Sequence, residues 1–287
     1  MARAKNDTPA PQARLLDGTL ARIVPAQFGS GWEVDVDGTP QSHVDLDDPT
    51  HLSFEYVARM GAVIDQLRLP RQPLTAIHLG AGGLTLPRYI EATRPGSRQQ
   101  VVELEPALWD LVRENLPLPR GAQIRVRIGD ARAGLGRLPA ALVGAADLVV
   151  SDVYSGAQTP AHLTTVEFYT EAARYLAPEG VLLVNVADGA GLAFARRQVA
   201  TISRVLEHVI ILAEVQTLKG RRFGNLVVAA SAHPLPTAWL PRLMAAGPHP
   251  AKVAEGREVD EFARGARVAV DGDATDSPKP ASTLFER

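Results

Sequence analysis

The sequence has no cysteine, no long hydrophobic run and no marked excess of charge of either sign. Without cysteine there can be no disulfide, thiolate metal site or cysteine nucleophile. A net charge of −2 provides no global basic field to hold nucleic acid or an anionic membrane. No apolar run is as long as a membrane span, and residues 1–11 lack the apolar core of a signal peptide. We therefore expect a cytoplasmic protein that binds neither nucleic acid nor membrane.

The 287 residues suffice for one large α/β domain with a small appendage. Residues 1–12 are polar and predict a disordered end. Residues 13–48 predict a small antiparallel β-hairpin domain of about three strands, with a hairpin turn at Asp37 and Gly38. Such a module is marginal alone, so it should pack on a larger domain or pair with a second copy. Its exposed strands favour a homodimer.

Residues 49–232 alternate between strand and helix patterns. A first helix is expected to run to about residue 67, capped by Asp48 or Thr50. Strands are then expected at residues 74–79, 100–104, 124–128, 148–151, 181–186, 209–215 and 225–230. Helices are expected between them at residues 87–93, 106–115, 131–135, 165–175 and 193–207. This alternation predicts an α/β fold with a Rossmann-like, doubly wound, mostly parallel sheet that ends in an antiparallel hairpin at its edge.

The last region, residues 233–287, is richer in proline and charge and predicts a partly disordered tail. Short helices are expected in it at residues 239–245 and 259–266, and disorder from residue 271 onward.

A glycine turn, residues 78–83 (HLGAGG), follows the first parallel strand. Gly80 and Gly82 would let the backbone turn tightly and approach a ligand, whose acidic groups would face the free N–H groups of the next helix. Thr85 stands where the third glycine of the dinucleotide fingerprint belongs, which counts against NAD. The turn is also compatible with a purely structural role.

Acidic residues end three successive strands after this turn. Glu103 is placed to accept hydrogen bonds from ribose hydroxyls. Asp130 is placed to accept one from an adenine amino group, with Ala131 narrowing the base pocket. Asp152 and Tyr154 would lie beside the reactive sulfur of an S-adenosylmethionine-type nucleoside, where a carboxylate can hold an ammonium or take its proton. Each acid has a structural alternative, such as a helix cap for Asp130.

With these motifs the chain resembles the spermidine synthase (polyamine aminopropyltransferase) family over roughly residues 32–230. The resemblance rests on the glycine turn, Glu103, Asp130 and Asp152, and on the segments VDGTPQ (36–41), PAHL (160–163), EFY (167–169) and LAPEGVL (176–182). It implies that decarboxylated S-adenosylmethionine donates an aminopropyl group to a small-molecule amine. It also implies that Glu103 holds the ribose, Asp130 faces the adenine and Gln41 lies near the sulfonium side chain.

The chain departs from the family pattern on the amine side. Asp152 matches the first Asp of the family's D-S/T-x-D-P loop, but Ser155 replaces the second, which deprotonates the attacking amine. Gly83 replaces the Asp that anchors the aminopropyl amine, and residues 54–56 (FEY) replace a Tyr-His/Gln-Glu stretch. We predict that Asp152 and Tyr154 are catalytic and that Glu55 and Ser155 lie on the acceptor side.

Three functions are compatible with this pattern. The favoured one is an aminopropyltransferase with an altered catalytic loop; the others are an S-adenosylmethionine-dependent methyltransferase and a non-catalytic nucleoside-binding or assembly protein. An NAD oxidoreductase has no use for Asp130 or for the N-terminal β module. The seven histidines show no metal-ligand spacing, so no metal is predicted.

Overall fold

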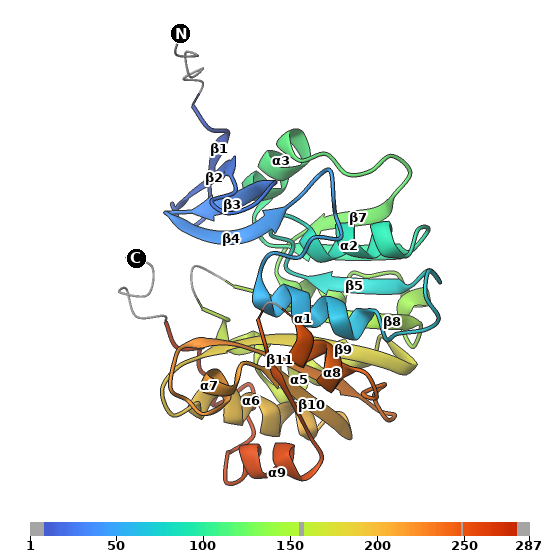
Figure 1. Cartoon of the computed structure of the whole chain (residues 1–287), viewed down its shortest axis with the longest axis vertical. Helices are drawn as coiled ribbons and strands as arrows, with labels where there is room; N and C mark the ends of the chain where they lie inside the picture. The colour runs from blue at the N-terminus through green and yellow to red at the C-terminus, as the bar shows by residue number, and fades with distance from the viewer. Residues whose placement is uncertain (1–8, 155–157, 248, 280–287) are drawn as a thin grey trace.

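The computed structural model describes residues 9–154, 158–247 and 249–279, which form two sheets (Figure 1). The N-terminal sheet is antiparallel, in the order β1-β2-β3-β4. Its strands are β1 (Gln12–Arg14), β2 (Leu20–Pro25), β3 (Trp32–Val36) and β4 (Thr39–Val44). The sheet therefore has one strand more than the sequence predicts, because β1 is too short to show an alternating pattern. Whether it also mediates homodimer formation stays a prediction.

The main sheet has the order β12-β10-β11-β9-β8-β5-β6-β7. Its strands are β5 (Thr75–Leu79), β6 (Arg98–Glu103), β7 (Gln123–Ile128), β8 (Ala146–Ser151), β9 (Leu176–Asp188), β10 (His208–Ala213), β11 (Gly224–Ser231) and β12 (Lys252–Glu255). Strands β5 to β9 pair in parallel, and β10, β11 and β12 join antiparallel. The Rossmann-like, mostly parallel sheet and the separate N-terminal sheet are confirmed.

Helices cover both faces of the main sheet because successive residues of its buried strands point to opposite sides. Ala76 of β5 contributes to a core with α1, α2 and α8, whereas Ile77 contributes to a core with α4, α5, α6 and α9. The first group is α1 (Glu55–Ile64), α2 (Thr85–Thr93) and α8 (Leu240–Ala246). The second is α4 (Ala131–Leu135), α5 (Val166–Ala173), α6 (Ala193–Ser203) and α9 (Arg257–Ala263). The remaining helical segments are α3 (Pro106–Asn115), α7 (Val215–Leu218) and the 3-10 turns η1 (Ala140–Leu142) and η2 (Ala161–Leu163).

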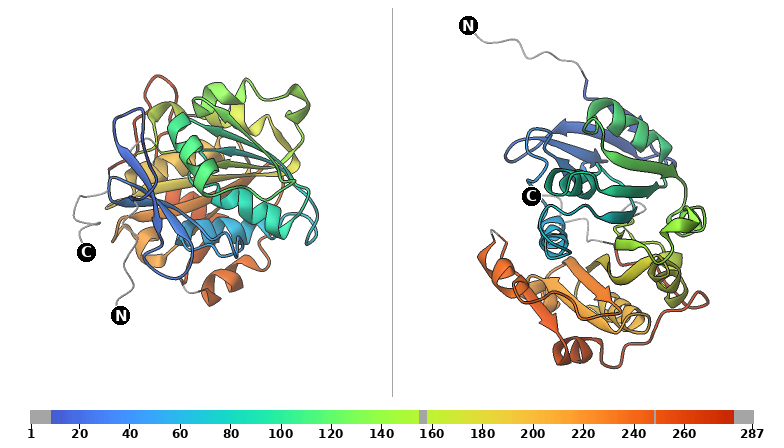
Figure 2. Two further views of the ribbon diagram at one scale, coloured as in Figure 1. Left: turned by 90° about the horizontal axis from the view of Figure 1, so that it is seen from above. Right: turned by 90° about the vertical axis from the view of Figure 1, so that its right-hand side faces the viewer.

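The N-terminal sheet packs on the main domain. Ile23 and Val34 share a buried core with Leu108 and Val112 of α3 and with Val101 of β6. Both views of Figure 2 place the blue N-terminal sheet next to α3. Because a four-stranded sheet buries little by itself, this contact supplies the second layer that it needs.

Three local predictions are wrong. The first helix begins at Glu55, not near residue 50, because the Asp48 side chain accepts hydrogen bonds from the backbone and hydroxyl of Thr50 and closes a turn there. Strand β12 was not expected, so β10 lies inside the sheet, not at its edge. Residues 271–279, for which composition predicts disorder, are held by specific contacts. Arg132 donates to Asp271 at 2.7 Å, and Thr159 donates its N–H to Ser277 at 2.8 Å.

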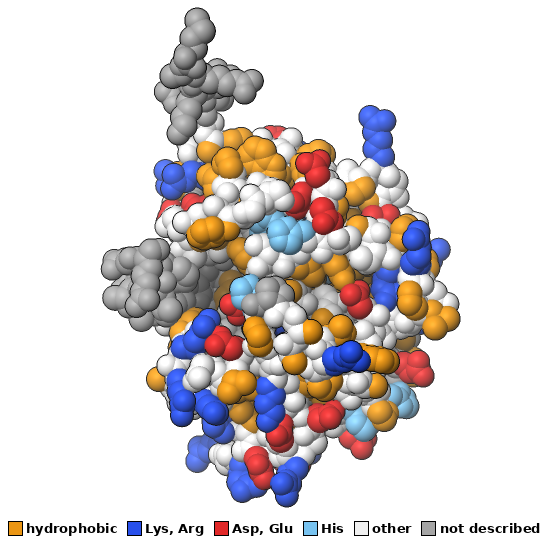
Figure 3. Space-filling model, viewed as in Figure 1, with side chains coloured by type: hydrophobic (Ala, Val, Ile, Leu, Met, Phe, Trp, Pro, Cys, Tyr) orange, Lys and Arg blue, Asp and Glu red, His pale blue; other side chains and the backbone are white. Residues whose placement is uncertain are grey.

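Basic and acidic side chains are interspersed on the face shown in Figure 3, as the small net charge leads one to expect. Within the described residues, none of the helices combines the length and the apolar character needed to cross a bilayer.

Candidate active site

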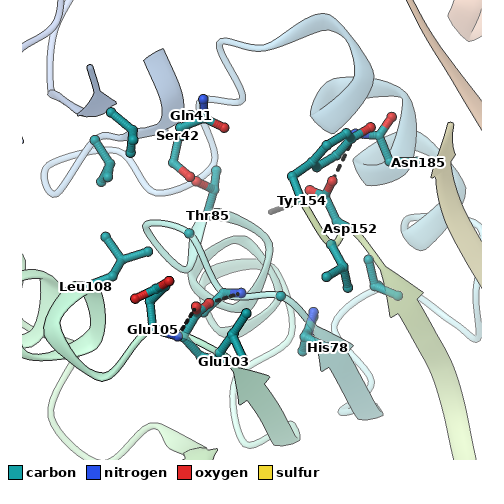
Figure 4. Close-up of a pocket in the computed structure, with 18 of the residues that line it drawn as sticks. Gln41, Ser42, His78, Thr85, Glu103, Glu105, Leu108, Asp152, Tyr154 and Asn185 are labelled. Carbon is teal, nitrogen blue, oxygen red and sulfur yellow. Dashed lines mark hydrogen bonds between the residues drawn. The ribbon is translucent and has the colours of Figure 1, made fainter. Parts of the chain in front are cut away.

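A cavity of about 510 Å³ lies at the carboxyl ends of the parallel strands, where β4 of the N-terminal sheet forms one wall. This volume is typical of small-molecule sites, and the carboxyl edge is where open α/β sheets bind ligands. Figure 4 shows Glu103 and Glu105 on one side of the cavity and Asp152, Tyr154 and Asn185 on the other. The two sides follow the strand order, because Glu103 ends β6 and Glu105 follows it, whereas Asp152 and Tyr154 follow β8 and Asn185 lies on β9.

The glycine turn contacts the three parts of the cavity wall that carry Ser42, Glu103 and Asp152. Gly80 has a φ of +88°, and a Cβ there would overlap the backbone carbonyl of Asp152. Gly82 has a φ of +49°, and a Cβ there would overlap the hydroxyl of Ser42 on β4. Glycine is required at both positions by backbone conformation as well as by space. Gly80, Gly82 and Gln41 all line the cavity, and their role in binding a nucleoside stays a prediction.

Glu103 is held rigidly at the end of β6. Its carboxylate accepts the N–H of Ala81 at 2.8 Å and the N–H of Glu105 at 2.9 Å, and the residue is 6% exposed. Burial raises the pKa of Glu103, and these backbone N–H groups act in the opposite direction. Each carboxylate oxygen has a second lone pair, so the group can still accept hydrogen bonds from a ligand.

Asp130 serves two neighbours. One oxygen accepts the N–H of Ala133 at 2.9 Å and so caps α4; the other lies 2.7 Å from the Nε2 of His162. Burial alone would raise the pKa of Asp130, but these hydrogen bonds lower it. The cap alternative for Asp130 is therefore confirmed. Asp130, Ala131 and His162 all line the cavity, and the contact of Asp130 and Ala131 with an adenine stays a prediction.

Asp152 is fixed by a chain of amides. Asn225 of β11 donates to the side-chain oxygen of Asn185 on β9 at 2.9 Å, and Asn185 donates to Asp152 at 2.9 Å. The hydroxyl of Tyr56 donates to the other Asp152 oxygen at 3.3 Å. Burial raises the pKa of Asp152 despite these donors. For Tyr154, burial and then the charge of Asp152 raise the pKa well above the ordinary value.

The structure does not place Glu55 on the acceptor side of the cavity, contrary to the prediction. Its carboxylate pairs with Arg59 at 3.0 Å and with His249 at 3.5 Å, and it does not line the cavity. Tyr56 takes its place, since neighbouring side chains on a helix point about 100° apart. Ser155 lies outside the described residues.

Several lining residues escaped the sequence analysis. Asn185 interrupts the apolar run VLLVNVA (181–187), and a polar residue inside a buried strand is a usable signal. Tyr56, Ser42 and His162 leave no comparable trace, because only the fold brings them to the cavity.

The charges around the cavity have one sign. Among the described residues, the lining contains five carboxylates and neither Lys nor Arg. The acids are Asp17, Glu103, Glu105, Asp130 and Asp152. Within the same part of the chain, no three His, Asp or Glu side chains cluster as a metal site would require. The cavity therefore suits a cationic ligand.

Comparison with known proteins decides the family. A probable spermidine synthase from Corynebacterium glutamicum is 31% identical, with a TM-score of 0.81 over 95% of this chain and 100% of that one. The chain belongs to the spermidine synthase family. A polyamine aminopropyltransferase from Chromobacterium violaceum is 27% identical over 192 residues, which cover 67% of this chain and 69% of the relative. No protein-family model matches the chain.

The fold extends beyond the spermidine synthase family. Human methyltransferase-like protein 13, in complex with SAH, shares it at 20% identity with a TM-score of 0.53 over 76% of this chain and 96% of that one. A fold common to two reaction types cannot choose between them, so the reaction must be argued from the site.

One departure from the spermidine synthase pattern is built into the packing. The N–H of Gly83 donates to the Ser42 hydroxyl at 2.9 Å, and a Cβ on Gly83 would lie 2.7 Å from Cγ2 of Val44. A side chain at this position would overlap Val44 unless the Val44 side chain or β4 moves.

Proposed function

We propose that this protein transfers an aminopropyl group from decarboxylated S-adenosylmethionine to an amine. The observation that best supports this proposal is the charge of the cavity lining, which has five carboxylates and neither Lys nor Arg among the described residues. A donor with a sulfonium and an ammonium but no carboxylate matches such a lining, whereas a carboxylate-bearing ligand would meet repulsion. Membership in the spermidine synthase family supports the same donor.

The nucleoside would lie across the glycine turn. Glu103 would accept hydrogen bonds from the ribose hydroxyls with its free lone pairs, and Asp130 would accept one from the adenine amino group. Gln41, on β4, would lie near the sulfonium side chain. In this arrangement the chain's own groups hold the donor rigidly, and orientation supplies much of the rate enhancement.

The reaction is a single displacement. The lone pair of the acceptor nitrogen attacks the carbon bound to sulfur, the C–S bond breaks, and its electron pair leaves on the sulfur of methylthioadenosine. The nitrogen then carries one proton too many, which passes to Asp152 or to water. Burial raises the pKa of Asp152 and so makes it a better proton acceptor than an ordinary carboxylate. Asn185 and Tyr56 keep the carboxylate in place, and Tyr154 borders it.

A methyltransferase remains the second candidate, because Gly83 offers no side chain to anchor an aminopropyl amine. The donor would then be intact S-adenosylmethionine, whose carboxylate needs partners. The N–H groups of Ala81 and Gly83 are already bound by Glu103 and Ser42. Two N–H groups of the turn are therefore not free for the carboxylate of the intact donor, which favours the aminopropyl donor.

Two measurements test the proposal. Calorimetry compares the binding of decarboxylated and intact S-adenosylmethionine, and mass spectrometry then detects methylthioadenosine formed with a panel of amines. We expect tighter binding of the decarboxylated nucleoside and amine-dependent methylthioadenosine release. Asp152→Asn should lower the rate by about 10² or more while leaving nucleoside binding intact, and Asp110→Asn on the outside of α3 is the matched control. Preference for the intact nucleoside would favour methyl transfer, and no turnover with either would favour a binding protein.

A further inference from the structure

The half of the cavity beyond Asp152 differs from the nucleoside half. Going along the sheet from β8, the next strands are β9 and β11, which contribute Asn185, Ala187 and Asn225 to the lining. Phe54 before α1, whose ring centroid lies 6.4 Å from that of Tyr56, and Phe223 before β11, whose ring lies next to Gly189 just after β9, also line the cavity. Because the nucleoside carboxylates lie on the opposite side, at β6 and β7, this half is where an acceptor would enter.

Charge is scarce in this half. Among the described residues lining it, Asp152 is the one carboxylate. Asp188, close by at the end of β9, accepts the N–H groups of Gly189 and Ala195 at 2.7 and 2.8 Å and so caps the turn into α6. The carboxylate of Glu55 points to Arg59.

The polar side chains that remain in this half are neutral. Asn225 donates to Asn185, and Asn185 donates to Asp152. A diamine carries a second ammonium, which would lie among Phe54, Phe223 and Ala187 without an anionic partner. Burying an unpaired charge is strongly unfavourable, and a cation over a phenyl ring recovers only part of the lost hydration.

We propose that the acceptor carries a single amine on an uncharged, largely apolar body. The inference rests on the proposed aminopropyl transfer and specifies its acceptor. Asp152 would hold the reacting nitrogen, and the phenyl rings and Ala187 would contact the hydrocarbon part.

Putrescine and n-pentylamine are the decisive pair, since a methyl group in one replaces the second amine of the other. Methylthioadenosine release is measured for each at saturating decarboxylated S-adenosylmethionine. We expect kcat/KM for n-pentylamine to exceed that for putrescine by about tenfold or more. A preference for putrescine would overturn the acceptor inference and leave aminopropyl transfer standing. No product with either amine, or with the wider panel, would overturn both.

A variant with an added charge tests the physical cause. Ala187 follows Asn185 by two residues and so shares its face of β9. Ala187→Asp should shift the ratio of the two kcat/KM values toward putrescine by about tenfold, while Ala187→Asn, equal in size and uncharged, should not. Unchanged methylthioadenosine binding and melting temperature would show that both variants fold. Equal ratios in the two variants would contradict the proposal.

Discussion

Glu103→Gln is the sharpest test of the nucleoside site. The glutamate accepts two backbone N–H groups, from Ala81 and Glu105, and has lone pairs left for a ribose. A glutamine offers one oxygen, so its NH₂ must face one of those N–H groups or turn toward the ligand. Losing a hydrogen bond to a charged acceptor costs about 1.5–3 kcal/mol, which corresponds to about a 10- to 150-fold weaker Kd for methylthioadenosine.

Calorimetry with methylthioadenosine measures this change, and Glu114→Gln, exposed on α3, is the control. The buried N–H left without a partner should also destabilise the fold by about 1–3 kcal/mol, visible as a lower melting temperature. Equal affinity in Glu103→Gln and the natural sequence would refute the assignment of the ribose to Glu103. A lower melting temperature with unchanged affinity would leave Glu103 with a purely structural role.

Three further perturbations test the surroundings of the cavity. Burial lowers the pKa of His78 from 6.5 to about 4, so stability should be full above about pH 6.5 and fall by about 3 kcal/mol toward pH 4. In His78→Asn, denaturant titrations should show this slope removed, and an unchanged slope would contradict it. Burial raises the pKa of Asp152 above the ordinary value of 3.8, so the fold loses stability as the pH rises above 3.8 and the buried carboxyl ionises. Asp152→Asn removes this charge and should therefore raise the melting temperature more at about pH 8 than at about pH 4. Gly83→Ala should cost about 1–3 kcal/mol by overpacking against Val44, and Val44→Ala in the same chain should recover part of that cost; additive effects in thermal denaturation would rule out the clash.

The parallel sheet was predictable because several of its strands are apolar runs and helix patterns separate the strands. Val181 to Val184 are all nearly fully buried, as such a run implies. The placement of Glu103, Asp130 and Asp152 at one edge also followed, since carboxyl ends of parallel strands meet there. These features depend on local periodicity and on one topological rule, and both can be read from a single sequence.

Other features depend on contacts between distant segments. Strand β12 is four residues long, and it is a strand because Ile211 and Leu212 of β10 offer it partners. Whether Glu55 or Tyr56 faces the cavity depends on where α1 begins, because a shift of the helix start by a few residues changes which side chain points inward. The contact between His162 and Asp130 joins η2 to the start of α4, and no spacing in the sequence indicates it.

The glycine turn shows how Gly83 is tied to the packing of the N-terminal sheet. At Gly83 the backbone lies against Val44 and donates to Ser42, so β4 occupies the space into which a side chain at this position would project. A side chain at position 83 and the present position of the Val44 side chain exclude each other. Restoring an aspartate at position 83 without shortening Val44 should therefore displace the sheet and Gln41 with it, and should not regain an amine anchor. The absence of a charged side chain at position 83 and the closure of the cavity by β4 are two consequences of one packing arrangement, and in the proposed reaction they leave Asp152 to hold the acceptor amine.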